Sequence, residues 1–164
     1  DLTRRLSELG MNAQDNERLT QHIHALSLGL LRARQPADVI QTLAACLKED
    51  FAGESIRVIS FTTIPGMLGD WFSHIPAEDP RLQPFADCLA NGEPICGRLN
   101  PEKLPVLFGD DRVHTQSIAL IPVADVGLIA VGSADPHRFY PGMGTLFLRW
   151  IGDLYQTALT QARR

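Results

Sequence analysis

The chain has 164 residues, of which 45% are hydrophobic and 21% charged, and its formal net charge is -4 at pH 7. This length is enough for one domain with a substantial core, and the composition is that of a globular protein rather than a disordered or fibrous one. Phosphate binding needs a concentrated basic face, which this acidic balance argues against, so we expect no nucleic-acid partner.

No apolar run approaches the roughly 20 residues needed to span a bilayer, and the first residues, DLTRRLSELG, lack the apolar core of a signal peptide. The three cysteines form no CxxC pair, and an odd number at wide spacing is a poor disulfide framework. We therefore expect a cytoplasmic protein with no membrane partner. Because Asp1 already lies within a helical pattern, we also expect that the chain is a fragment whose upstream residues are missing.

Apolar residues recur three or four positions apart through most of residues 1–34, which predicts a helical segment before a domain at 35–164. A continuous helix of this length would reach about 50 Å at roughly 1.5 Å per residue, which is longer than a small domain needs to cover its own sheet. We expect the overhang to mediate homodimerisation through a narrow apolar seam. The alternative is a helix that folds back over its own domain.

A second helix is predicted to begin at Pro36, because a proline in the first turn removes no helical hydrogen bond. Its apolar face would consist of Val39, Leu43, Cys46 and Leu47, and Cys46 is there most simply a buried small hydrophobe. SIRVISFT at residues 55–62 is rich in β-branched and aromatic residues and predicts the first strand, in the interior of a sheet.

The middle of the chain predicts short elements separated by prolines. Residues 67–72 predict a weak second strand, and residues 73–84 a loop. FADCLA at 85–90 predicts a short helix, and PICGR at 94–98 predicts an edge strand, since its proline is tolerated only at a strand start. NPEKLPVLFG, at residues 100–109, predicts a helical turn or two.

The last third of the chain carries the strongest pattern. SIALIPV (117–123) and GLIAVGS (127–133) are joined by three residues, which predicts an antiparallel hairpin. Pro141 is expected to open the last helix, whose main apolar stripe is Met143, Phe147, Trp150, Leu154 and Ala158. Leu146, Ile151 and Tyr155 widen the stripe, so we expect this helix to face the sheet on one side and another helix on the other. The dimer contacts that we expect come from the two terminal helices: Leu19, Ile23, Leu26, Leu30, Trp150 and Leu154.

The order of the predicted elements resembles that of GAF domains: two helices, a strand pair, a short helix, an edge strand, and then a hairpin and a helix. EPICGRL, PEKLPVLFG and above all DPHRFYPGMGTLFLRWIG look like a bacterial domain-of-unknown-function family with a GAF-like fold. The resemblance implies an α+β, profilin-like fold, with a central antiparallel sheet of five or six strands and the long N- and C-terminal helices on one face. It also implies dimerisation through the terminal helices and, where such domains bind small molecules, a pocket on the loop-covered face.

A small-molecule site needs an apolar concavity with a few polar groups. Our candidates for the apolar walls are Trp71, Phe72, Phe85 and Phe108, and our candidates for the polar groups are Cys96, Arg98, His114 and Ser117. For each residue alone, a place in the core or on the surface is the simpler alternative. The sequence identifies no cofactor.

The evidence for catalysis is weak, and we predict no catalytic residue and no metal ligand. ICG around Cys96 is similar to a VCG segment of a GAF-fold reductase of free methionine sulfoxide, but residues 113–116, where that enzyme has its catalytic cysteine, hold no thiol. The five histidines form no metal-binding pattern, and no GxSxG is present. We expect a non-enzymatic regulatory or sensory module; the alternatives are an interaction scaffold with a closed pocket and a thiol-dependent reductase.

Overall fold

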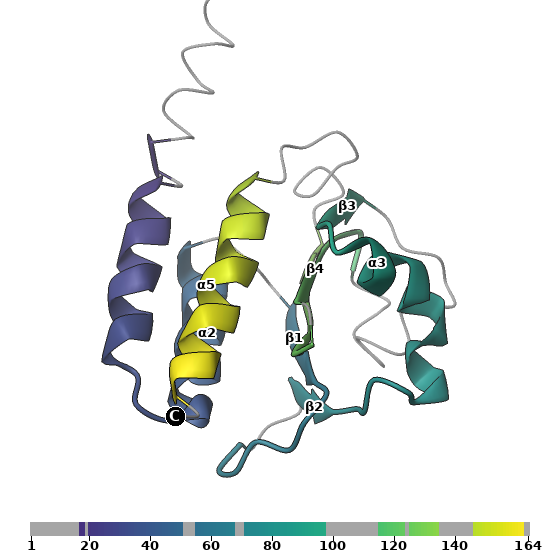
Figure 1. Cartoon of the computed structure of the whole chain (residues 1–164). Coiled ribbons are helices and arrows are strands. Elements are labelled where there is room, and N and C mark those ends of the chain that lie inside the picture. The colour runs from purple at the N-terminus through teal and green to yellow at the C-terminus, as the bar shows by residue number, and fades with distance from the viewer. Residues whose placement is uncertain are drawn as a thin grey trace, which may run out of the picture.

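The structure, a computed structural model, describes residues 17–18, 20–50, 55–67, 71–97, 115–123, 125–134 and 146–162. Within these residues the chain has an α+β fold (Figure 1). Its elements in chain order are a helix at residues 20–32, α2 (Pro36–Asp50), β1 (Ser55–Ser60), β2 (Phe72–His74), η1 (Pro80–Phe85), α3 (Ala86–Asn91), β3 (Ile95–Gly97), β4 (Ser117–Val123), β5 (Gly127–Ser133) and α5 (Leu146–Ala162).

The five strands form one sheet in the order β2-β1-β5-β4-β3. The predicted hairpin is confirmed, because β4 pairs antiparallel with β5, and β3 lies at a sheet edge as predicted. The expectation of an entirely antiparallel sheet is wrong, because β2 pairs with β1 in parallel, with Val58 opposite Phe72. Trp71, directly before β2, already lies beside Val58, because the Val58 N–H donates to the Trp71 carbonyl at 2.8 Å.

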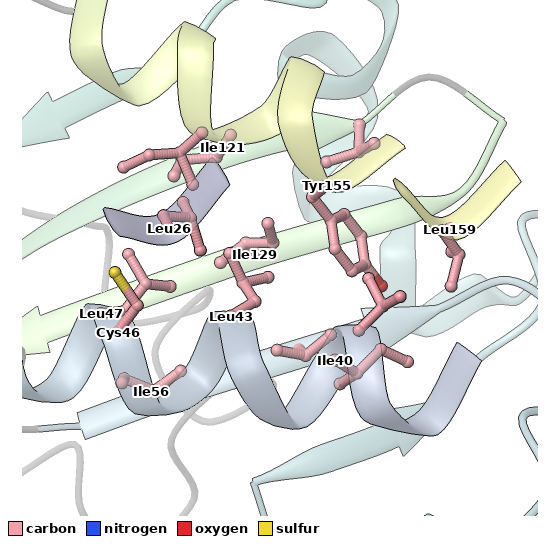
Figure 2. Packing of buried hydrophobic residues seen from close by; sticks show 14 of the residues in the cluster. Leu26, Ile40, Leu43, Cys46, Leu47, Ile56, Ile121, Ile129, Tyr155 and Leu159 are labelled. Carbon is pink, nitrogen blue, oxygen red and sulfur yellow. The ribbon is translucent and has the colours of Figure 1, made fainter. Parts of the chain in front are cut away.

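One face of the sheet is covered by the long helices. Alternate residues of β4, namely Ala119, Ile121 and Val123, share a core with α2 and α5, as the two-residue period of a strand requires. Figure 2 shows side chains of α2 and α5 meeting over the sheet, with the Tyr155 ring between the two helices. The predicted apolar face of α2 is confirmed, because all four of its residues are buried: Val39, Leu43, Cys46 and Leu47.

The other face of the sheet is covered by η1 and α3 (Figure 1). The intervening residues of the hairpin, including Ile118, Leu120 and Leu128, pack there against Leu82 and Phe85. The predicted short helix is present as α3 and ends at Gly92, which takes a left-handed conformation (φ 72°) and whose N–H donates to the Cys88 carbonyl at 3.0 Å. The molecule therefore has a second, smaller core opposite the long helices.

The helix at residues 20–32 lies against α2 and α5, on the side away from the sheet (Figure 1). Leu26 is 2% exposed and Leu30 is 4% exposed, and both belong to the same core as α2 and α5. A Cβ at Gly29 would lie 3.0 Å from Thr42 Cγ2, so the missing side chain lets this helix approach α2 closely. The described part of the N-terminal segment thus folds back over its own domain.

The buried face of α5 lies to one side of the main predicted stripe and includes Ile151 and Tyr155, two of the residues predicted to widen it. It consists of Leu148, Ile151, Tyr155 and Leu159, whereas Trp150 is 38% exposed and Leu154 is half-buried. The reason is Gly152, where a Cβ would lie 3.0 Å from Ile121 Cγ2, so that α5 lies closest to β4 along the line through Gly152. Leu19, Met143 and the side chain of Phe147 lie outside what the structure describes. None of the described helices has the length and apolar character needed to cross a membrane.

The observed positions of two short elements differ from those predicted from the sequence. The weak strand expected at residues 67–72 is a three-residue strand at Phe72–His74, and the loop expected at 73–84 contains η1. Asp79 caps η1 by accepting a hydrogen bond from the Arg81 N–H, and Pro80 occupies the first turn. The local signals for a helix start were therefore present in the sequence.

Candidate functional site

A hollow of about 470 Å³ lies on the side of the sheet covered by η1 and α3. It sits where β1 ends and where the chain turns from β4 to β5. Its described lining is Phe61, Ala77, Glu78, Asp79, Leu82, Gln83, Ala86, Leu89, Ala90, Pro122, Val123 and Asp125. We call it the main hollow.

Backbone hydrogen bonds fix the sheet side of the main hollow. The Phe61 N–H, directly after β1, donates to the Val126 carbonyl at 2.9 Å, and the Val126 N–H donates to the Val123 carbonyl at 3.1 Å. Asp125, at the tip of this turn, takes a left-handed backbone conformation with φ 61°, which aspartate tolerates better than most residues. The end of β1 and the β4–β5 turn are thus held together as one wall.

The opposite wall begins at a tight turn, in which the Asp79 N–H donates to the Pro76 carbonyl at 3.0 Å. The Asp79 carboxylate accepts hydrogen bonds from the Arg81 Nε at 3.1 Å and the Arg81 Nη2 at 3.0 Å. These side-chain bonds, helped by the Arg81 backbone N–H, lower the pKa of Asp79, and the same pairing raises the pKa of Arg81. Asp79 is therefore ionised at neutral pH and already paired with a cation.

The rim and the floor of the main hollow differ in character. Glu78 and Asp125 are exposed on separate turns, and within the described residues neither carboxylate has a hydrogen bond or an ion pair. The floor is apolar and includes the buried Leu82 and the half-buried Phe61 and Leu89. The described lining contains no cysteine, histidine, serine or threonine, so its polar groups are the carboxylates and the Gln83 amide.

A second hollow, of about 380 Å³, lies between α2 and the edge of the sheet at β1. Lys48, Arg57 and Trp71 give it a basic and aromatic lining, completed by Gln41, Ala44, Ala45, Ser55 and Ile56. One nitrogen of Arg57 is used locally, since Nη1 donates to the Ile56 carbonyl at 2.9 Å. We call this the basic hollow; it lies on the face of the sheet that the long helices cover.

The described residues among those predicted to bind a ligand do not converge. Trp71 and Phe72 are half-buried at the β2 edge, with ring centroids 6.3 Å apart and planes at 77°. Cys96 is half-buried in β3, at the opposite edge, and Ser117 is fully buried in β4. Four strand spacings separate β2 from β3, which is about 19 Å.

Phe85, another predicted wall residue, is fully buried in the smaller core and lines neither hollow. Arg98, Phe108 and His114 lie outside the described residues. Of the eight predicted site residues, Trp71 alone lines one of these two hollows within the part of the chain that the structure describes. The aromatic residues chosen from the sequence mostly fill the chain's own cores.

The family model described as "Protein of unknown function, DUF484" matches residues 1–162. The chain belongs to this family. The domain-of-unknown-function part of the resemblance is thereby confirmed. No curated protein matches the chain.

In this DUF484 chain the cysteines lie apart from the main hollow. Cys96 packs against the core under the long helices, whereas Cys88 belongs to the smaller core on the opposite face of the sheet. Cys88 is therefore not placed as a neighbouring partner of Cys96. Among the described residues, no group of three or more histidine, cysteine, aspartate or glutamate side chains could hold a metal ion.

The polar residues that line the main hollow were not predicted from the sequence: Glu78, Asp79, Gln83 and Asp125. An aspartate directly before Pro80 is a signal for a capped helix start, and recognising it would have placed η1 and its turn in the region expected to be loop. No local sequence signal links Glu78 to Asp125, because the two residues lie on separate turns that only the sheet topology brings to the same hollow.

Proposed function

We propose that this DUF484 chain is a non-enzymatic, GAF-like regulatory or sensory module that binds a small molecule in the main hollow and pairs with a second copy through its terminal helices. The observation that carries the proposal is the main hollow itself. Its volume of about 470 Å³ falls within the range of about 300–1,000 Å³ typical of ligand pockets. Backbone hydrogen bonds fix its walls, and its described lining combines an apolar floor with polar residues at the rim.

The division of the two sheet faces supports the GAF-like part of the proposal. Long helices cover one face, with α2 and α5 sharing a core with the sheet, while short helices and turns cover the other, where the main hollow lies. This arrangement supports the proposal of a pocket on the loop-covered face. The parallel pairing of β2 is a departure from the antiparallel sheet that the resemblance implies.

The binding part of the proposal can be tested by filling the main hollow. Ala86 is exposed on α3 and lines it, so Ala86→Phe should obstruct it, whereas Ala45→Phe, also at an exposed helical alanine, should obstruct the basic hollow instead. A ligand at 100 times its dissociation constant adds about 2.7 kcal/mol of stability, or about 5–10 °C in Tm for a chain of this size. The assay is thermal unfolding against a library of small metabolites.

We expect at least one compound to raise the Tm of the unmodified chain and of Ala45→Phe, and to have no effect on Ala86→Phe. Compounds that stabilise Ala86→Phe as well as the unmodified chain would contradict binding in the main hollow. A complete lack of stabilising compounds would favour the alternative of an interaction scaffold without a ligand.

The dimer part of the proposal rests on a second apolar face of the helix at residues 20–32. Leu26 and Leu30 are used inside the chain, but Leu28 is 42% exposed and Leu31 is 74% exposed, one turn apart on the opposite side of this helix. Trp150 of α5 is a further large apolar side chain of the terminal helices that is exposed among the described residues. The seam of the proposed dimer thus lies on Leu28, Leu31 and Trp150 rather than on Leu26 and Leu30.

Light scattering at tens of micromolar tests this seam. Leu31→Glu should shift the dimer toward monomer, because it places a charge in the apolar contact, whereas Thr63→Glu on an exposed turn should have no effect. If the unmodified chain is already a monomer at this concentration, the dimer proposal is refuted.

A further inference from the structure

We infer that the main hollow selects a small organic cation with an apolar body, in which an ammonium or guanidinium group lies between Glu78 and Asp125 and the body lies on the floor formed by Phe61, Leu82 and Leu89. This inference rests on the proposed function, because it names the chemical class of ligand for the same hollow. It is carried by the cavity, its apolar floor and the sign of its charges taken together.

The floor determines that the ligand has an apolar part. Phe61 and Leu89 pack against the smaller core but remain half-buried, so each keeps apolar surface facing the main hollow. Pro122, at the end of β4, is also half-buried and adds a ring face beside them. Burying apolar surface stabilises a complex by roughly 25 cal/mol per Å². A ligand that leaves this floor exposed to water would therefore lose much of the available binding free energy.

The rim determines the sign of the charge. Glu78 stands on the turn before η1 and Asp125 on the turn between β4 and β5, so the two carboxylates come from different walls. Neither is compensated within the described residues, whereas Asp79 is held by Arg81 in a two-bond pair. No lysine or arginine is among the described lining residues. A cation gains attraction from both unpaired carboxylates, and an anion would meet like charge from either side.

The basic hollow provides a contrast within the same molecule. It is of similar size, but Lys48 and Arg57 give its described lining the opposite sign. If the main hollow were only an unspecific crevice, an amphipathic cation would show no preference between the two. Preference for the main hollow therefore measures the effect of its carboxylates.

The experiment uses three probes that share a phenyl body and differ in charge: phenethylammonium, 2-phenylethanol and 3-phenylpropanoate. Each is titrated into the full ¹⁵N-labelled chain, and amide shifts are followed at Glu78, Gln83, Leu89 and Asp125 for the main hollow and at Lys48 and Trp71 for the basic hollow. We expect phenethylammonium to shift the first set and to bind there about fivefold more tightly than the alcohol. That factor follows from two exposed charge contacts, each within the range measured for surface ion pairs.

Charge-removing variants test the assignment to the two carboxylates. The double variant Glu78→Gln/Asp125→Asn should bring the affinity for phenethylammonium to that for the alcohol and should abolish its dependence on salt. Asp87→Asn is the matched control. Asp87 is exposed on α3 and does not line the main hollow, so this substitution removes a carboxylate charge outside the site. It should leave the affinity within a factor of about two, since a charge outside the contact acts weakly through water.

The possible results separate the two levels of the proposal. Equal or tighter binding of the alcohol or the carboxylate in the main hollow would overturn the inference about charge while leaving small-molecule binding intact. A cation that binds the double variant as tightly as Asp87→Asn would also overturn it, and so would a titration in which no probe shifts the first set of amides. Loss of the proposed function itself would appear in a different assay, as metabolites that stabilise Ala86→Phe as well as the unmodified chain.

Discussion

Replacing Gly127 with alanine is expected to destabilise the hairpin that frames the main hollow. Gly127 opens β5, where it pairs with Val123 of β4 on one side and with Ser60 of β1 on the other. A Cβ at this position would lie 1.8 Å from the Ile59 carbonyl oxygen, 2.9 Å from the Ile59 carbonyl carbon and 3.2 Å from the Ser60 Cα. All three are backbone atoms, so no side-chain rotation relieves the contact.

The size of the effect follows from that geometry. Side-chain overpacking in a core costs about 1–3 kcal/mol, and a clash with the backbone of a central strand must move the strand itself. We therefore expect Gly127→Ala to lower the free energy of unfolding by about 3 kcal/mol or more. Gly92→Ala is the control: Gly92 is also in the left-handed region, but nothing lies within 4 Å of its Cβ position, so only the backbone preference of about 1 kcal/mol is lost.

Urea unfolding followed by circular dichroism measures both variants, and an unchanged slope against urea would show that the comparison is one of stability alone. The expected order is the unmodified chain, then Gly92→Ala, then Gly127→Ala. If Gly127→Ala were as stable as Gly92→Ala, the close approach of β5 to β1 would be wrong.

Two further predictions concern the N-terminal helix and η1. Leu26→Ala should lower the free energy of unfolding by about 2–5 kcal/mol because Leu26 is buried in the shared core, whereas Gln21→Ala, at an exposed site on the same helix, should change it by less than about 1 kcal/mol. Similar values in urea unfolding would contradict the packing of this helix on α2 and α5. Asp79 should contribute fully to the stability of η1 at neutral pH, above its unfolded-state pKa, and this contribution should be lost as the pH falls through its lowered folded-state pKa. In an NMR titration, Arg81→Gln should raise the pH midpoint of the Asp79 carboxyl group, because it removes the paired cation. An unmoved midpoint would refute the pairing.

The hairpin was predictable because its signal is local. SIALIPV and GLIAVGS each supply seven residues buried almost throughout, and the short link between them leaves few alternatives to direct pairing. The apolar face of α2 was predictable for the same reason, since a helix that packs on a sheet repeats its apolar residues every three or four positions.

Elements that depend on tertiary pairing were not predictable to the same degree. The three residues of β2 carry little strand signal, and their position and direction are determined by the pairing of Phe72 with Val58. On α5, an apolar pattern extends over both sides of the helix, and the close approach at Gly152 decides which side faces the sheet.

The candidate site was the least predictable part. Aromatic residues such as Phe85 were natural choices for pocket walls, but a large apolar side chain is stabilised equally well inside a core, where Phe85 lies. Glu78 and Asp125 resemble ordinary turn residues, and their relation arises only when the Phe61 N–H bonds to the Val126 carbonyl and closes that end of the sheet. A site whose residues come from separate turns has no characteristic spacing in the sequence by which it could be recognised.

Native mass spectrometry of the freshly purified chain tests the central claim, binding in the main hollow, most directly. After incubation with a small-molecule extract, the unmodified chain and Ala45→Phe should carry the same added mass, which collisional activation releases, and Ala86→Phe should not carry it. The same spectra report the number of subunits. An added mass that persists in Ala86→Phe and disappears in Ala45→Phe would contradict the account.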